Sequence, residues 1–179
     1  MPSLLPLPKI LVLALVLVAG VCDFRSRRIP NWLTVTGVLL GFAANALIAQ
    51  LAGLGIAALG LVLAMAVYLP LYLLRAMGAG DVKLMAAVGA LVGPSSWLGI
   101  FLAAAIAGGI IAVCVAAIKG RLGQTLFNVQ IILAELLHFR APYRTAPALD
   151  VHHEDSLRIP HGVSIALGTC VFLFVIGRS

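Results

Sequence analysis

Gly78-Ala79-Gly80-Asp81-Val82-Lys83-Leu84 interrupts an otherwise apolar sequence and puts an ionisable side chain at the edge of the apolar stretch that follows. A carboxyl at the edge of hydrocarbon is costly to keep there, so Asp81 indicates a functional site. Asp23 stands in a similar position, at the end of an earlier apolar stretch. The two acidic residues therefore suggest a catalytic pair that the fold brings together.

The composition of the whole chain predicts a membrane protein. Of its 179 residues 63% are hydrophobic and 10% are charged, and the mean hydropathy is +1.15, far outside the range of soluble globular domains. At roughly 20 apolar residues per spanning helix, the length allows about six spans and no separate soluble domain. The predicted fold is all-α, a polytopic bundle of six transmembrane helices in a single domain over residues 1–179. The six apolar stretches are residues 10–22, 32–50, 54–74, 82–92, 97–118 and 162–176.

The distribution of lysine and arginine predicts the orientation of this bundle, because basic residues favour the cytoplasmic side. With the N-terminus outside, ten of the twelve basic residues fall in inside connections, and only Lys9 and Arg178 fall outside. Asp23 and Asp81 then both lie at the cytoplasmic mouth of the bundle. This topology explains the net charge of +6, so no nucleic-acid partner is expected.

The longest polar connection, residues 119–159, is predicted to be a cytoplasmic loop. Within it, residues 122–139 carry spaced apolar side chains and predict an amphipathic helix at the membrane interface. The cluster His152-His153-Glu154-Asp155 consists of side chains that bind divalent metals. Adjacent ligands on an irregular backbone make a poorly organised site, so a solvated loop is favoured and no metal or other cofactor is expected.

The glycines before Asp81 are predicted to shape the backbone beside it. The stretch 82–92 is short for a hydrocarbon core of about 30 Å, which predicts irregular backbone through Gly78 and Gly80. Glycine adopts conformations that are closed to other residues, so an extended substrate segment is expected to lie there beside Asp81. The alternative is a plain loop between two helices.

Four more residues have expected roles. Asn31 follows Pro30 and is predicted to cap the second helix. Trp32 and Trp97 are predicted to mark opposite membrane interfaces, where indole rings are enriched. Lys83 stands two residues after Asp81, where it would partner a phosphate headgroup, a substrate carboxylate or nothing specific.

Two neighbouring carboxyls can hydrolyse a peptide bond, provided that one is ionised and one protonated. The ionised group deprotonates water and the protonated group donates to the carbonyl oxygen, a division that like-charge repulsion enforces. Asp81 begins a predicted helix and Asp23 ends one, so the helix dipoles favour the anion on Asp81. The hypothesis from sequence is that Asp81 is the general base and Asp23 the acid.

Three motifs give the chain a resemblance to a known family. Asp23, the run Arg25-Ser26-Arg27-Arg28-Ile29-Pro30-Asn31 and the run from Gly78 to Leu84 resemble, in that order, the motifs of the prepilin peptidases. These are intramembrane aspartyl proteases of the Gly-x-Gly-Asp class, and the chain is similar to their short form from tight-adherence pilus systems. The resemblance implies that Asp23 and Asp81 are the catalytic pair, preceded by the motif glycines Gly78 and Gly80.

The resemblance also implies a substrate and a place in the cell. The expected substrates are prepilins and pseudopilins, cut after a glycine that ends a short basic leader, at the cytoplasmic face of a bacterial inner membrane. Larger members of the family carry a cysteine-rich insert and methylate the new N-terminus; this chain has no such insert, so methylation is not expected. The family usually has tyrosine where His161 stands, which leaves the role of His161 open, as the sequence leaves the oligomeric state.

Two readings from other classes stay open at this point. Membrane aspartates beside a broken helix also bind and relay cations, as in a small ion-coupled transporter or channel. Such transporters tend to contain duplicated halves, and this sequence shows only a faint echo between Arg28-Ile29-Pro30 and Arg158-Ile159-Pro160. A passive assembly scaffold is the other reading, and it predicts that Asp23→Asn and Asp81→Asn are harmless.

Overall fold

The computed structural model describes residues 6–74, 77–120, 122–123, 127, 130 and 161–176, and it contains no strand among them. The all-α prediction is confirmed over this part of the chain. Most of the predicted helix 122–139, and the whole cluster 152–155, lie outside the described residues. The elements are α1 (Pro6–Ser26), α2 (Asn31–Leu73), α3 (Ala79–Ile118), α6 (His161–Val171) and the π-helical turn η2 (Phe172–Ile176).

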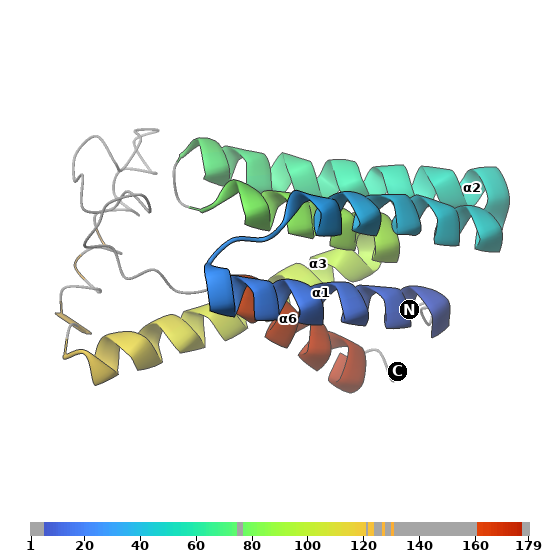
Figure 1. Cartoon of the computed structure of the whole chain (residues 1–179). Helices are drawn as coiled ribbons and strands as arrows, with labels where there is room; N and C mark the ends of the chain where they lie inside the picture. Colours follow the sequence, from blue (N-terminus) through green and yellow to red (C-terminus); the bar gives the residue numbers. More distant parts are fainter. Residues whose placement is uncertain are drawn as a thin grey trace.

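Helix α2 is a hairpin of two helical legs. Its backbone leaves helical geometry at Ala49 and at Gln50, which has a positive φ of 51°. Figure 1 shows the first leg (residues 31–48) and the second leg (51–73) running antiparallel beside each other. Next to the turn, Gly53 lies so close to the Asn45 carbonyl that a Cβ there would overlap it. The missing side chain therefore lets the chain reverse tightly.

Helix α3 is likewise broken into a first leg (79–92) and a second leg (94–118). Gly93 adopts φ 73° and ψ 173°, and Pro94 has no N–H to donate back to Ala90. The freed carbonyls are satisfied by a side chain from α2, because Asn45 Nδ2 donates to the oxygens of Ala90 at 3.0 Å and Leu91 at 3.2 Å. Irregular backbone at membrane depth requires this kind of internal partner.

The first leg of α3 is the centre of the fold, since every side chain from Asp81 to Val92 is buried except that of Lys83. It packs against both legs of α2 at positions without bulky side chains. Gly60 and Gly89 approach so closely that a Cβ on either would overlap the other's carbonyl oxygen. Small residues drive such helix association in lipid, where the hydrophobic effect between helices is absent. Helix α6 packs on α1 and α3.

In the part of the chain that the structure describes, three helices, α1, α2 and α3, are long and apolar enough to cross a membrane. Many large apolar side chains point outward, including Leu47, Leu51 and Leu59, as expected of surfaces that face lipid. The chain is therefore a membrane protein. Counting the legs separately, the helices α1, α2, α3 and α6 give six segments that overlap the six predicted stretches. That each crosses the membrane, with the N-terminus outside, stays a prediction.

One expectation about the membrane interfaces is wrong. Trp97 was expected at an interface, but its side chain is fully buried and its Nε1 donates to the Met85 carbonyl at 3.1 Å. The indole packs inside the bundle, and its hydrogen bond joins the two legs of α3. Trp32, in contrast, is 64% exposed.

Candidate active site

Asp23 lies near the C-terminal end of α1, and its side chain is only 8% exposed. The helix closes just after it, because Arg27 adopts a left-handed backbone conformation and its N–H donates to the Asp23 carbonyl at 2.8 Å. The carboxyl of Asp23 points to another helix: its Oδ2 accepts a hydrogen bond of 2.8 Å from the backbone N–H of Gly162. A buried carboxyl is thus held by the first turn of α6, where free N–H groups are available.

Asp81 lies in the first turn of α3 and is 9% exposed. Its N–H donates to the Gly78 carbonyl at 3.2 Å, and the Gly78 backbone amide faces its carboxyl. Gly78 is the residue before the helix, with φ −79° and ψ 152°, and α3 begins at Ala79. The prediction of irregular backbone through Gly80 is therefore wrong at Gly80, and neither motif glycine uses a conformation reserved for glycine.

The motif glycines instead provide space. A Cβ on Gly80 would lie 3.3 Å from the Cβ of Ile29, a contact tighter than side chains normally make, so the connection between α1 and α2 packs directly on the start of α3. A Cβ on Gly78 would lie 3.6 Å from Asp81 Oδ2, beside the carboxyl itself. Gly80 therefore makes room for Ile29, whereas Gly78 leaves space next to the Asp81 carboxyl.

The fold brings Asp23 and Asp81 into one electrostatic environment, although 58 positions separate them in the sequence. The carboxyl of Asp81 interacts with that of Asp23 and with His161, the first residue of α6. Three elements, α1, α3 and α6, therefore meet at a pair of buried acids. Two carboxyls that interact in a buried site repel each other when both are ionised, so the arrangement favours one ionised and one protonated carboxyl.

The geometry removes the reason for assigning separate roles to the two carboxyls. From sequence, only Asp81 was expected at the start of a helix. In the structure Asp23 also faces a helix N-terminus, that of α6, through its bond to Gly162. Both anions are then favoured by a helix dipole, so the hypothesis that dipoles make Asp81 the base and Asp23 the acid loses its support.

Tyr68 is a neighbour of Asp81 that sequence reasoning missed. It lies on the second leg of α2, is buried, and interacts electrostatically with the Asp81 carboxyl. The sequence contained a signal for this position: the residues of this leg that are buried recur at helical spacing, and Tyr68 is the last of them. They are Gly53, Ala57, Gly60, Ala64 and Tyr68.

Lys83 and Asn31 form a pair on the surface near the site. The Nζ of Lys83 donates to Asn31 Oδ1 at 2.9 Å, which ties the start of α3 to the start of α2. The prediction that Asn31 caps α2 is wrong, since Pro30 occupies the cap position and no side chain bonds there. A role for Lys83 in binding substrate stays a prediction.

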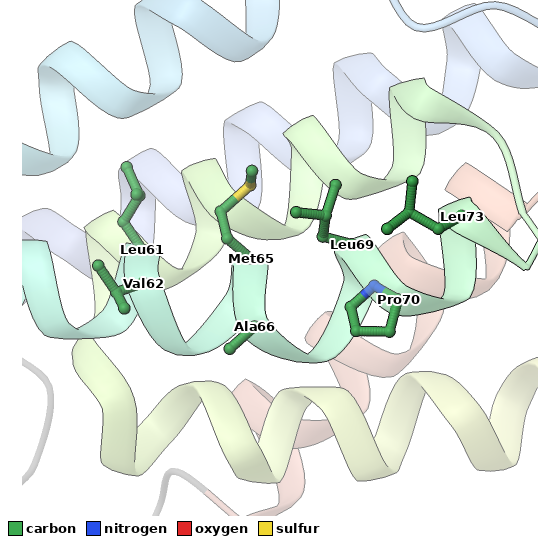
Figure 2. Close-up of a pocket in the computed structure, with 7 residues that line it drawn as sticks. All are labelled: Leu61, Val62, Met65, Ala66, Leu69, Pro70 and Leu73. Atoms are coloured by element: carbon green, nitrogen blue, oxygen red, sulfur yellow. The ribbon is translucent and has the colours of Figure 1, made fainter.

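A shallow groove of about 430 Å³ lies on the second leg of α2. Figure 2 shows that its lining side chains all project from this leg. All of them are apolar, so the groove can hold a hydrocarbon chain or an apolar segment but carries no acid, base or nucleophile. Over the described residues, no three His, Cys, Asp or Glu side chains gather as a metal site would require. The groove residues are Leu61, Val62, Met65, Ala66, Leu69, Pro70 and Leu73.

Comparison with known proteins gives one match. Residues 10–113 match the model of the type IV leader peptidase family. This stretch runs from α1 into the second leg of α3 and contains both Asp23 and Asp81, along with Tyr68. No curated protein and no solved structure matches the chain.

Proposed function

The chain belongs to the type IV leader peptidase family, and from this premise we propose that it is an intramembrane aspartyl endopeptidase with Asp23 and Asp81 as its catalytic pair. Membership makes the chain a peptidase and points to prepilins as its substrates. One observation carries the assignment of the residues: two buried carboxyls from distant parts of the chain share one electrostatic environment. A membrane bundle has little reason to bury two like charges together unless chemistry uses them.

The proposed reaction needs only the two carboxyls and water. One carboxylate takes a proton from water as the oxygen attacks the peptide carbonyl, and the protonated partner donates to the carbonyl oxygen. The single proton is shared by the pair rather than fixed on either residue. Gly162 keeps one oxygen of Asp23 in place, and the space at Gly78 leaves room for an extended peptide beside Asp81.

The proposed substrate is a prepilin or pseudopilin with a short basic leader ahead of an apolar helix. Cleavage would follow the glycine that ends the leader, at the cytoplasmic face of a bacterial inner membrane. This side is supported by the basic residues that flank the acids, since Arg25, Arg28 and Lys83 are all exposed near the ends of α1 and α3. As in the short tight-adherence form, one domain would perform this cleavage without methylating the product.

Co-expression with a prepilin tests the proposal. A tagged prepilin is expressed with the wild-type chain, with Asp23→Asn or with Asp81→Asn, and leader removal is followed by gel shift and by mass spectrometry of the new N-terminus. Both variants are expected to leave the leader in place while remaining in the membrane. Asp150→Asn makes the same chemical change in the polar connection 119–159, far from both acids in the sequence, and should cleave normally. Normal cleavage by either site variant would refute the proposed pair.

A further inference from the structure

The register of two packed helices places Tyr68 opposite Asp81. The second leg of α2 and the first leg of α3 run antiparallel (Figure 1) and touch at Gly60 and Gly89. Tyr68 and Asp81 each lie eight residues from this contact, toward the same end of the pair. At a rise of 1.5 Å per residue, both side chains reach the same level about 12 Å away. Their electrostatic interaction agrees with this register.

An aromatic cluster fixes the ring of Tyr68. Its centroid lies 6.2 Å from that of Trp97 and 5.8 Å from that of Phe101, with interplanar angles of 74° and 80°. Trp97 and Phe101 stack on each other at 5.5 Å, and the Trp97 indole is bonded to Met85 on the leg that carries Asp81. Edge-to-face contacts of this kind restrict a ring to one orientation. The phenol is therefore held rigidly relative to Asp81.

The hydroxyl of Tyr68 remains accessible at the end of this fixed ring. Tyr68 is only 5% exposed, and its hydroxyl is not one of the fully buried polar atoms without a partner among the described residues, so this end of the ring is not sealed inside the fold. A phenol hydroxyl at the end of a fixed ring, beside the acid with which it interacts electrostatically, is placed to bond a ligand at that acid. A neutral phenol donates a hydrogen bond, which neither carboxylate of the pair can do once ionised.

We propose that the Tyr68 hydroxyl donates a hydrogen bond to the carbonyl oxygen of the peptide bond that is cleaved beside Asp81. As water adds to that carbonyl, negative charge gathers on its oxygen, and a donor that is already oriented stabilises this charge without reorganisation. Tyr68 is then a third catalytic residue, supplied by α2 to a site whose acids come from α1 and α3. The proposal rests on the proposed peptidase function.

The test compares two tyrosines on the same leg of α2. Tyr68→Phe and Tyr72→Phe each remove one hydroxyl, but Tyr72 lies one turn further on and is 38% exposed. Cleavage kinetics are measured in detergent with a purified prepilin whose basic leader ends in glycine. For Tyr68→Phe, kcat is expected to fall on the order of 10²-fold with KM nearly unchanged, the effect of losing one oxyanion donor. Tyr72→Phe is expected to match the wild type.

The outcomes separate this proposal from the one on which it rests. Wild-type kcat in Tyr68→Phe, an equal loss in Tyr72→Phe, or a loss through KM alone would each overturn the role of Tyr68. Cleavage that survives Asp23→Asn or Asp81→Asn would instead overturn the catalytic pair. If Tyr68→Phe fails to accumulate, fluorinated tyrosine placed at position 68 keeps the ring and changes only the acidity of the phenol. A kcat that does not change with that acidity would also overturn the proposal.

Discussion

The two ends of the first leg of α3 differ in how fully their buried polar groups are hydrogen-bonded. At the Gly93-Pro94 end, the break leaves backbone carbonyls without their helical partners, and the Asn45 side chain donates hydrogen bonds to them. At the Asp81 end, two buried carboxyls meet; the Gly162 N–H donates to one oxygen of Asp23, and the Gly78 amide faces the Asp81 carboxyl. A carboxylate has room for about four hydrogen bonds. Among the described residues, Asn45 donates to the carbonyls at the first end, whereas at the second end the amides of Gly78 and Gly162 do not use the full acceptor capacity of two carboxyls.

This difference separates a structural polar site from a functional one in the same buried helix. A polar group that the fold satisfies contributes stability, and its loss should lower stability. Polar groups that the fold brings together without full pairing reduce stability, and they persist where chemistry needs them. Substitutions at the two ends should therefore change different quantities.

The largest effect is expected from replacing both acids. In the double variant Asp23→Asn, Asp81→Asn, the rate of leader removal should fall by about 10⁴-fold or more, since neither carboxyl remains to activate water. Its thermal stability in detergent should not fall, because a pair of like charges leaves the interior. Initial cleavage rates and thermal unfolding of the same preparation measure both quantities. Unfolding of the double variant under conditions where the wild type is folded would contradict the comparison.

Gly162→Ala should be the next largest change, because it displaces one acid and leaves both present. A Cβ on Gly162 would lie 2.9 Å from the Cβ of Asp23 and 3.0 Å from its Oδ2, so the carboxyl must move. A displacement of this kind is expected to lower kcat by about 10²-fold. Gly109→Ala is the matched control, since nothing lies within 4 Å of a Cβ there. Equal kinetics for the two alanine variants would show that the position of Asp23 is not critical.

Asn45→Ala, at the Gly93-Pro94 end, should lower stability and leave catalysis unchanged. It leaves the carbonyls of Ala90 and Leu91 without their donor, and an unsatisfied buried carbonyl costs about 1–3 kcal/mol. The unfolding free energy should drop by about 2 kcal/mol, while kcat per folded molecule stays at the wild-type value. Denaturant titration in mixed micelles, paired with cleavage assays at low temperature, measures each part. A large loss of kcat in a stable variant would show that the two ends are coupled.

The smallest effect is expected from Lys83→Met, which removes an exposed hydrogen bond to Asn31 and a charge near the site. Exposed interactions of this type contribute about 0.5 kcal/mol, so stability and kcat should hardly change. Steady-state kinetics with the same prepilin test this expectation. A rise in KM of about tenfold, or 1.4 kcal/mol, would instead assign Lys83 to substrate binding.

The helical part of this fold could be predicted well from the sequence. Even the breaks fall at or next to the predicted ends, since Gln50 is the last residue of the stretch 32–50 and Gly93 follows the stretch 82–92, because turns and prolines are local signals. The details of the helix ends were predicted less well. Asn31 bonds a lysine from another helix instead of capping its own, and Trp97 packs inside the bundle, since both choices depend on neighbours that are distant in the sequence.

The sequence by itself determined that this protein lies in a lipid membrane and that its secondary structure is helical. Composition and apolar run length require helices in lipid, because a backbone there must satisfy its own hydrogen bonds, and they also put Asp23 and Asp81 at helix ends. Only the tertiary structure decided which groups meet at those acids. Contacts such as Gly60 against Gly89 set the register between helices, and that register brings Tyr68 to Asp81, as the docking of α6 brings Gly162 to Asp23. Register depends on how whole surfaces fit, which no local pattern specifies.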